Sequence, residues 1–466
     1  MRGLPAPVQV LLLTQMLFNI GFYLVVPFIA VQMAGTLGAS GAAIGLVLGL
    51  RTFSQQGLFF LGGGLSDRFG PRPILLVGVA LRIAGFLVAG MAQGVTTMVV
   101  GVVLIGFAAA LFSPAVESTL AMEGLHLERT GRDTRSRIFA LDAAWSRIGV
   151  LVGPVLGAAL IPVGFTAVCL AGAAVFAVIF ATHAVMLSRS RIGRGAGADP
   201  GVPEGGAGPV RPASVLASWG AVLRNRTFLG FAALYSTYLV AHNQLYLALP
   251  VELRRAAGSD ALLGWFFAVA SIWGIALQGP VHRRAAAAGA PAALTAGFGA
   301  MALSFAVVAV AAPFDLPGAV ALLPALLFVL LLNLGDMIAV PVARDLVGDI
   351  GGNRDLGSYY GFLNTAGGLA VLVASTILGD LLDAAATPGP AAALPWTVMA
   401  VLLCASAAGL RRMALRHAGT APGTSSRDAA RGDPRAAHDG RHSAPAAGTT
   451  AARASSPSTR PTGDTE

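Results

Sequence analysis

Long apolar runs, separated by short polar connections, follow one another along most of the chain. Most have about 18–25 residues, the length that a helix needs to cross a hydrocarbon core roughly 30 Å thick. Backbone N–H and C=O groups at that depth must find partners within the chain, so the pattern predicts helices. Apolar and polar positions do not alternate within the runs, which argues against a membrane barrel. The twelve predicted segments are 7–33, 41–65, 73–93, 95–119, 138–161, 165–187, 228–250, 261–280, 291–312, 318–342, 357–379 and 393–411.

Composition agrees with this pattern. Of 466 residues, 55% are hydrophobic and 11% are charged, whereas about 25% of the residues of soluble domains are charged. The sequence therefore predicts an all-α integral membrane protein. The first run, 7–33, is too long for a signal peptide, and no A-x-A site ends it. Cys169 and Cys404 both fall in apolar segments, so neither a disulfide framework nor a metal site is predicted.

Two polar stretches divide the chain into four predicted parts. Residues 1–187 and 228–412 are each expected to form a bundle of six membrane helices. Residues 188–227 begin as a flexible Gly/Pro-rich cytoplasmic linker and then carry Val215, Trp219 and Val222 on one face of a short amphipathic helix. Residues 413–466 are rich in Ala, Gly, Pro, Ser, Thr and Arg, which predicts a disordered cytoplasmic tail.

The placement of arginines predicts how the helices are oriented. All 31 basic residues are arginines, and the net charge is +9. If both termini are cytoplasmic, most arginines lie in cytoplasmic loops and only Arg254 and Arg255 lie in a loop on the other side, as the positive-inside rule requires. The arginines are dispersed among loops instead of gathered on one face, so nucleic-acid binding is not predicted. The expected partners are the lipid bilayer and a small-molecule substrate, and the protein is expected to act as a monomer.

Three short matches indicate that the two halves repeat one another. The sequence "YLVVP" at 23–27 recurs as "YLALP" at 246–250, each followed by a glycine at the same spacing. "PAVESTL" from Pro114 matches "PVARDLV" from Pro341, and Phe139 matches Tyr360, at nearly the same offset. A repeated six-helix half implies two pseudo-symmetric bundles with a site at their interface.

A charged, glycine-rich string follows the second segment. "GGLSDRFGPR" resembles the G-x-x-x-D-R-x-G-x-R signature of the major facilitator superfamily, in the turn between the second and third helices. The resemblance implies the twelve-helix fold of that family and a cytoplasmic latch that holds one conformation and breaks in the other. An aspartate there can face the positive N-terminus of a neighbouring helix, and an arginine can pair with an acid at another helix end. The predicted latch residues are Gly63, Asp67, Arg68, Gly70, Arg72 and, as a partner, Glu117.

Further stretches resemble a motif and one particular branch of this superfamily. "GVLVGPVLGA" in the fifth segment is similar to the antiporter motif of the superfamily, on Gly149, Gly153, Pro154 and Gly157, with Ala158 in place of the last glycine. "GLVLGLRTFSQQGLFFLGGGLSDRFG", "GVALRIAGF", "GSYYGF" and "LPW" together resemble the MdtH branch of bacterial multidrug-resistance transporters over most of residues 15–412. This resemblance implies a drug:proton antiporter of the bacterial inner membrane, driven by the proton gradient without a cofactor.

Polar residues at membrane depth are candidates for the site, because an arginine there costs on the order of 2.5–3.5 kcal/mol. Arg51 and Gln55 share one face of the second segment by their spacing, so both are predicted to point into the bundle. Arg82 and Arg147 lie within the third and fifth segments. For Arg82 a structural contact between helices is favoured, because third helices of this fold are usually peripheral.

The repeat offset predicts further residues of the substrate cavity. It carries Asn19 onto His242 and Gln15 onto Tyr238, and Tyr235 shares the face of these last two. The candidates for proton coupling are Asp336, Asp142 and His242, since the unperturbed pKa of a histidine lies near neutral. Asn19 stands where related drug antiporters often carry an acid, and the fourth segment lacks the arginine that many of them have.

These features predict a secondary active transporter that exports small amphipathic or lipophilic compounds by proton-coupled alternating access. Proton-coupled uptake of a small metabolite on the same fold is an alternative, because fold alone does not fix direction. A non-transporting membrane receptor is a further alternative, but it would not need two related halves. No G-x-S-x-G, H-E-x-x-H or phosphate-loop motif is present, so an enzyme is not predicted.

Overall fold

The computed structural model describes residues 4–130, 134–186, 220, 222–351, 356–385, 387 and 389–420. Within these ranges the regular secondary structure is all helical, with no strand, as the apolar runs predict. Most of the predicted linker, with Val215 and Trp219, and the predicted tail from residue 421 onward lie outside the described residues. The last helix continues to Thr420, beyond the expected boundary at residue 412.

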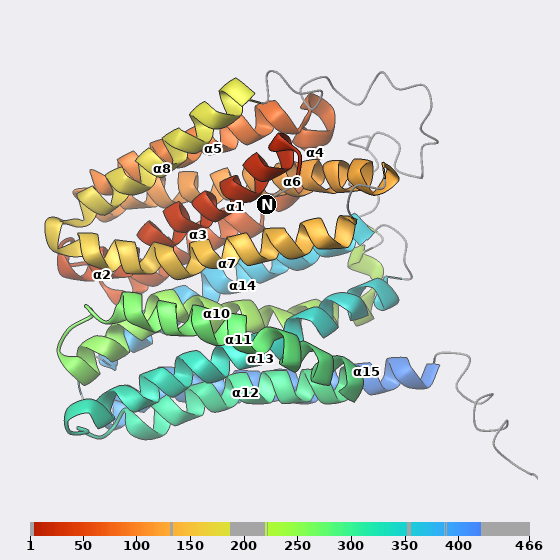
Figure 1. The fold of residues 1–466 in the computed structure, drawn as a ribbon. Coiled ribbons are helices and arrows are strands. Elements are labelled where there is room, and N and C mark those ends of the chain that lie inside the picture. The colour runs from red at the N-terminus through yellow and green to blue at the C-terminus, as the bar shows by residue number, and fades with distance from the viewer. Residues whose placement is uncertain are drawn as a thin grey trace, which may run out of the picture. The chain divides into compact units, whose positions relative to one another are not determined.

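The first half of the chain consists of helices, which connect through short turns where the structure describes the connection (Figure 1). They are α1 (Ala6–Val25), η1 (Val26–Phe28), α2 (Ile29–Gly35), α3 (Gly41–Gln56), α4 (Phe59–Phe69), α5 (Pro71–Gly90), α6 (Val95–Arg129), α7 (Arg135–Leu160), η2 (Ile161–Val163) and α8 (Phe165–Met186). The first predicted segment is interrupted by a turn of 3₁₀ helix at Pro27, because proline has no N–H to donate to the helix.

The second half repeats this order of long helices. It contains α10 (Arg226–Ala257), α11 (Leu263–Ala288), α12 (Ala290–Ala311), η4 (Gly318–Leu322), α13 (Leu323–Ile350), α14 (Leu356–Ala384), η5 (Pro390–Ala393) and α15 (Leu394–Thr420). Trp396 of α15 packs edge-on against Phe328 of α13, with ring centroids 5.4 Å apart. In this way the last helix joins the core of the second half.

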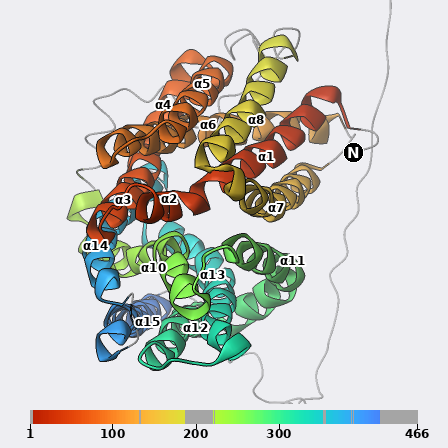
Figure 2. The same ribbon diagram turned by 90° about the vertical axis from the view of Figure 1, so that its left-hand side faces the viewer.

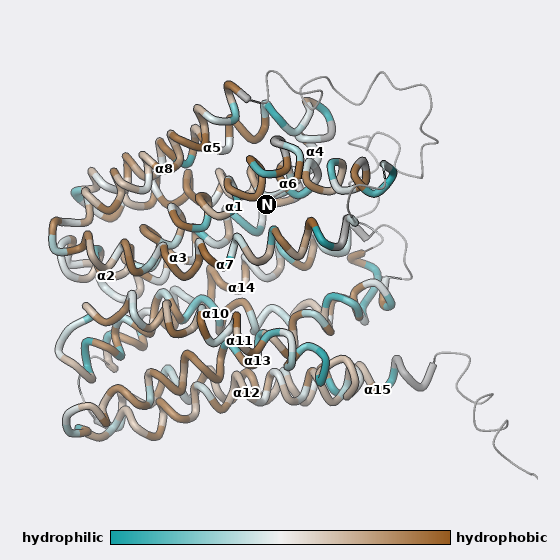
Figure 3. Tube along the Cα trace, viewed as in Figure 1, coloured by the Kyte–Doolittle hydropathy of each residue, from teal (hydrophilic) through white to brown (hydrophobic). Residues whose placement is uncertain are grey.

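Ten helical regions of the described chain are long and apolar enough to cross a membrane. The predicted segments 41–65 and 228–250 are not among them. The first is divided at Gly57 into α3 and α4, and the second lies in α10, whose polar residues include the buried Asn243 and Gln244. Hydrophobic residues dominate most of the other long helices (Figure 3). The fold is the twelve-helix fold of two six-helix bundles, and α3, with 16 residues, is too short for this criterion.

The two bundles meet along two pairs of helices, α3 with α14 and α7 with α11 (Figure 2). In the first pair, Gly41, Gly45 and Gly49 of α3 lie directly against the backbone of α14. A Cβ atom on Gly45 would collide with the carbonyl oxygen of Ser375, and one on Gly41 with that of Gly379. Small residues at four-residue spacing therefore permit this close approach.

Helix α4, which follows α3, ends in an abrupt corner. Gly63, Asp67 and Arg68 were expected in a turn, but α4 continues through them to Phe69. The corner is confined to Gly70, whose φ of 84° is a conformation that residues with a side chain rarely adopt. Pro71 then begins α5, where its fixed φ suits the first turn of a helix.

Two ends of the bundles can be named by their connections. The α4–α5 end carries that corner together with the α11–α12 and α13–α14 connections. The α2–α3 end carries the connections α2–α3, α7–α8, α10–α11 and α12–α13. At the α2–α3 end, the Asp383 carboxylate of α14 accepts hydrogen bonds from the Gly41 N–H, at 3.0 and 2.8 Å. An acid of one bundle thus caps the first helical residue of α3 in the other bundle.

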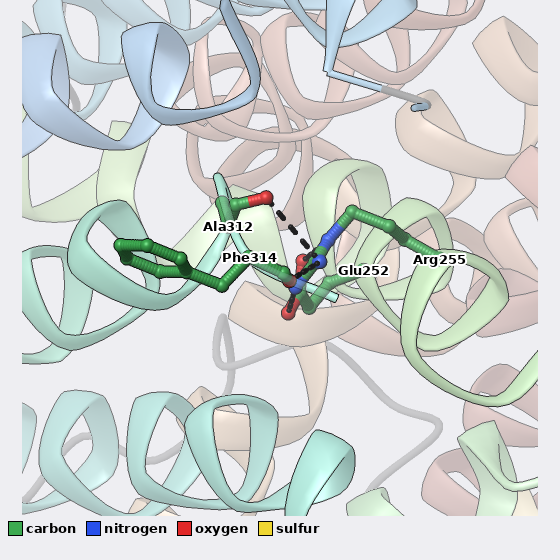
Figure 4. A network of polar contacts seen from close by, with 4 residues as sticks. All are labelled: Glu252, Arg255, Ala312 and Phe314. Carbon is green, nitrogen blue, oxygen red and sulfur yellow. Dashed lines mark hydrogen bonds and ion pairs between the residues drawn. The ribbon is translucent and has the colours of Figure 1, made fainter. Parts of the chain in front are cut away.

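A second polar contact fixes α10 at the same end (Figure 4). Arg255 donates from Nε and Nη2 to the two carboxylate oxygens of Glu252, at 2.9 and 2.6 Å. Its Nη1 lies 3.4 Å from the carbonyl oxygens of Ala312 and Phe314, after α12. Both charged side chains are almost fully buried, and the paired fork satisfies them there. The contact ties α10 to the α12–α13 connection.

Candidate functional site

A cavity of about 220 Å³ lies between the two bundles. Helices α1 and α7 of the first bundle and α10, α11 and α13 of the second contribute to its wall. Its lining residues are Tyr23, Arg147, Val150, His242, Leu245, Tyr246, Phe267, Ala270, Ser271, Gly274, Gln278, Asn333, Asp336 and Met337. The cavity combines an apolar and aromatic wall with a few polar groups, as small-molecule sites usually do.

A histidine–aspartate pair stands in the cavity. His242 Nδ1 of α10 lies 2.7 Å from Asp336 Oδ2 of α13. The side chains retain 32% and 17% of their exposure, so both remain accessible from the cavity. The other oxygen of the pair, Asp336 Oδ1, is buried and has no hydrogen-bond partner in the described part of the chain. The pair can therefore hold or release a proton inside the wall of the cavity.

Two tyrosines from the two halves meet beside this pair. The Tyr23 and Tyr246 side chains, from α1 and α10, interact with each other, and both line the cavity. They occupy equivalent positions in the sequence repeat, one in each of the matching "YLVVP" and "YLALP" stretches. We did not predict either as a site residue, although the repeat itself carried the signal.

An aromatic stripe on α10 leads to the cavity. Tyr235 stacks on Tyr238 with ring centroids 5.1 Å apart, and Tyr238 and Tyr246 lie 6.4 and 6.5 Å from the His242 ring. His242 is the member of the predicted face that lines the cavity. Tyr235 is buried, and Tyr238 packs beside it, so these two support the cavity wall from behind.

Arg51 of α3 is buried just outside the cavity. Its Cζ lies 5.3 Å from the centroid of the Tyr246 ring, and its Nη2 donates to Thr52 Oγ1 at 3.0 Å. Thr52 in turn donates to Asn243 Oδ1 at 3.2 Å, and Asn243 Nδ2 donates to Ser375 Oγ at 2.9 Å. This chain of polar contacts connects α3, α10 and α14 across the interface between bundles. Gln55, also predicted for the cavity, is half-buried on α3 and is not among the lining residues.

The predicted residues of α1 face the neighbouring helix α7. Asn19 Nδ2 donates to the Gln15 carbonyl oxygen at 2.8 Å, and Gln15 interacts with the carboxyl group of Asp142 on α7. None of the three is among the lining residues of the cavity. Gly149 explains part of this arrangement, because a Cβ there would lie 2.7 Å from Asn19 Cβ. The glycines at 149, 153 and 157 all lie against α1 and allow its close approach to α7, where Pro154 is accommodated inside the helix.

Arg82 of α5 is enclosed by aromatic rings. Its Cζ lies between 5.0 and 5.9 Å from the ring centroids of Phe18, Phe22, Phe86 and Phe176. None of its three side-chain nitrogens has a hydrogen-bond partner among the described residues. The expectation of an interhelical contact agrees with this position. The partners are π faces, which attract a cation through the ring quadrupole.

The predicted latch residues lie at the α4–α5 end. Arg72 Nη2 donates to the Ala184 carbonyl oxygen of α8 at 3.2 Å, and Arg68 is exposed over the neighbouring Phe69 ring. The charges that act on Glu117 of α6 include Arg344 of α13 in the other bundle. The Asp67 side chain lies outside what the structure describes.

A family model described as the Major Facilitator Superfamily matches residues 11–375. The chain belongs to this superfamily. Relatives within it include an uncharacterised MFS-type transporter of Mycobacterium tuberculosis, 33% identical over 88% of this chain and 94% of the relative. The multidrug resistance protein MdtH of Yersinia pestis is 28% identical over 86% of this chain and 92% of that protein. MdtH of Aeromonas hydrophila is 30% identical over 59% of this chain and 63% of that protein. The predicted membership, including the likeness to MdtH, is confirmed.

Solved structures of superfamily transporters share the fold. A peptide transporter aligns with a TM-score of 0.71 at 17% identity and covers 89% of this chain and 96% of its own. The nucleoside transporter NupG aligns with a TM-score of 0.70 at 13% identity over 88% of this chain and 99% of its own. At this identity the likeness concerns the fold alone. Membership of the superfamily, shown by the family model, makes this chain a multi-pass membrane transporter.

Proposed function

We propose that this transporter exports small amphipathic or lipophilic compounds in exchange for protons, by alternating access. The observation that carries the proposal is the His242–Asp336 contact of 2.7 Å within a cavity that both bundles line. A histidine changes charge near neutral pH, and ionisable groups at membrane depth commonly form proton relays. Binding of a substrate and binding of a proton would therefore compete within this cavity.

The direction of transport is supported by sequence. The multidrug resistance proteins MdtH are similar to most of the chain, and the glycine-rich stretch at 149–157 resembles the antiporter motif. We place the protein in the bacterial cytoplasmic membrane as a monomer, with both termini and the α4–α5 end on the cytoplasmic side. No cofactor enters this proposal, because the proton gradient is the energy source.

Closure at the α2–α3 end supports alternating access. The glycines of α3 pack against α14 there, and Gly264 of α11 packs against Pro154 and Ala158 of α7. In the proposed orientation this end is periplasmic, so the chain would be closed to the outside. The Asp67–Arg72 string would then act as the latch of the opposite conformation.

The proposed division of the chain remains 1–187, 188–227, 228–412 and 413–466, with α15 extending beyond the third boundary.

Export is tested by drug accumulation in bacterial cells. Cells that express the protein are expected to accumulate less of at least one member of a panel of toxic fluorescent compounds than cells with the empty vector. Dissipating the proton gradient with an uncoupler should remove the difference. The Asp67→Asn variant should also lose it while reaching the membrane in similar amounts. Higher accumulation in expressing cells would contradict export and support uptake.

The Asp383 cap provides a test of closure. Asp383→Asn is expected to weaken the two hydrogen bonds to Gly41, because a carboxylate accepts more strongly than an amide. One hydrogen bond contributes about 1 kcal/mol, which corresponds to about a fivefold shift in a two-state population. Spin labels on cysteines at the exposed positions Thr36 and Ser259, with Cys169 and Cys404 replaced by serine, report on the two bundles at this end. Their distance distribution should shift toward longer separations.

Asp315→Asn is the matched control, since this acid is exposed at the same end. It should leave the distance distribution unchanged. An Asp383→Asn distribution that coincides with that of the control would contradict a closing role for the cap.

A further inference from the structure

The charged groups of the cavity are unequally paired. Asp336 is the carboxylate among the lining residues, and His242 already contacts it. Arg147 is the guanidinium among them, and its hydrogen bond goes from Nη1 to the Gly274 carbonyl oxygen at a long 3.4 Å. In the part of the chain that the structure describes, the ion pairs do not include Arg147. His242 thus engages one oxygen of the cavity's acid and the other oxygen is buried, whereas the guanidinium of Arg147 is open to a ligand.

A second positive charge stands behind the wall. Arg51 lies 5.3 Å from the Tyr246 ring, which lines the cavity. It is 5% exposed, and its Nε has no hydrogen-bond partner within the described ranges. Coulomb interactions are stronger in such surroundings than in water. Both arginines therefore favour a negative charge in the cavity.

The rest of the cavity wall is apolar and aromatic, so it favours an uncharged ring in the ligand. The Tyr246 and Phe267 rings are stacked, with centroids 5.6 Å apart and planes 26° from parallel. Leu245 and Met337 continue the wall. The cavity volume of about 220 Å³ lies below the roughly 300–1,000 Å³ of sites for drug-sized ligands. A flat molecule of one or two rings fits this space and surface.

We propose that Arg147 binds the carboxylate of a small aromatic acid whose ring lies against Tyr246 and Phe267. The inference rests on the proposed function, because it takes this cavity as the substrate site. A guanidinium presents a planar fork of donors that matches a carboxylate with two parallel hydrogen bonds. Nη1 is the donor that Arg147 uses within the described chain, and the rest of the fork is available to the ligand.

This assignment predicts how the site selects its ligand. A neutral amide of the same ring would keep the stacking contact and lose the charge attraction to Arg147. An amine on the same ring would face the positive charges of Arg147 and Arg51. The acid that could pair with this amine, Asp336, already contacts His242. The order of affinity should therefore be carboxylate, then amide, then ammonium.

The experiment measures binding to the purified full-length protein in detergent. Tritiated 2-naphthoate is the probe, and unlabelled 2-naphthoate, 2-naphthamide and 2-naphthylmethylammonium compete with it. We expect 2-naphthoate to bind about tenfold more tightly than the amide, and the ammonium compound to compete least. The comparison needs no variant, so it remains valid if a substitution prevents folding.

Variants then assign the selectivity to Arg147. Arg147→Gln should bring acid and amide to equal affinity, whereas Arg147→Lys should retain part of the preference. Arg284→Gln removes the same charge from an exposed position of α11 and should behave like the original protein. Size-exclusion profiles and thermal midpoints confirm that each variant is folded.

The proposal is overturned if the amide competes as well as the acid, if the ammonium compound competes best, or if none of the three binds. It is also overturned if Arg147→Gln keeps the tenfold preference. Failure of the proposed function is a separate result: acid-selective binding would persist, but transport in proteoliposomes would not respond to a pH gradient.

Discussion

Asparagine in place of Asp336 is expected to abolish substrate-driven proton movement. The Asp336 carboxylate and the His242 imidazole, 2.7 Å apart, are the titratable pair of the cavity. Asparagine preserves the size of the side chain but cannot exchange a proton at any working pH, and glutamine at position 242 has the same defect. Positioned proton-transferring groups contribute about 10²–10⁴-fold to rates, so we expect the proton flux to fall at least about 100-fold in either variant.

The measurement uses proteoliposomes that contain a pH-sensitive dye and a compound identified in the accumulation test. Addition of the compound should change the internal pH with the original protein and leave it unchanged with Asp336→Asn or His242→Gln. Asn333→Ser is the control, because Asn333 lines the same cavity and does not titrate. Its proton-to-substrate ratio should be unaffected. Undiminished proton flux in both test variants would remove this pair from the coupling mechanism.

The fold was accessible from sequence because the bilayer imposes one solution on long apolar runs. Every long helix of the described chain coincides with a predicted segment. The breaks at Pro27 and Gly57 were not predicted. Average hydrophobicity over a segment does not register a local loss of helix geometry. It also does not register that Asn243 and Gln244 of α10 are buried between helices instead of facing lipid.

The site was only partly accessible. The repeat offset selected the face of α10 that carries His242, and the structure places that residue in the cavity. Asp336 was predicted as a candidate for proton coupling, but its contact with His242, 94 residues away in sequence, was not predicted. Such a pairing depends on how α10 and α13 are rotated about their axes, and the spacing within one helix does not determine this. The roles of these residues stay predictions.

The same limit explains why Gln15 and Asn19, predicted for the cavity, are not among its lining residues. Symmetry placed them opposite Tyr238 and His242, but the glycines of α7 draw α1 so close that Asn19 packs against Gly149. The repeat was more informative at Tyr23 and Tyr246, where the identical residue type recurs and the two side chains meet. Identity at equivalent positions was therefore a better indicator of the interface than polarity alone.

Valine in place of Gly45 is expected to prevent closure at the α2–α3 end and to stop transport. The Cβ atom of any larger residue would collide with the Ser375 carbonyl oxygen of α14, which is backbone and cannot move aside like a flexible side chain. Overpacking commonly costs about 1–3 kcal/mol, and 2 kcal/mol corresponds to roughly a 30-fold shift between two states. Because this cost arises where the two bundles touch, we expect the open form to dominate while each bundle remains folded.

Labels at positions 36 and 259 should report a longer distance in Gly45→Val, and compound transport should fall to the level of protein-free liposomes. Gly45→Ala, with the Cβ alone, should give a smaller shift in the same direction. Gly299→Val is the matched control, since no atom lies within 4 Å of the corresponding Cβ on α12. It should transport normally. If Gly45→Val transports at the original rate with an unchanged label distance, the α3–α14 contact is not required for closure, and alternating access must depend on another pair of helices.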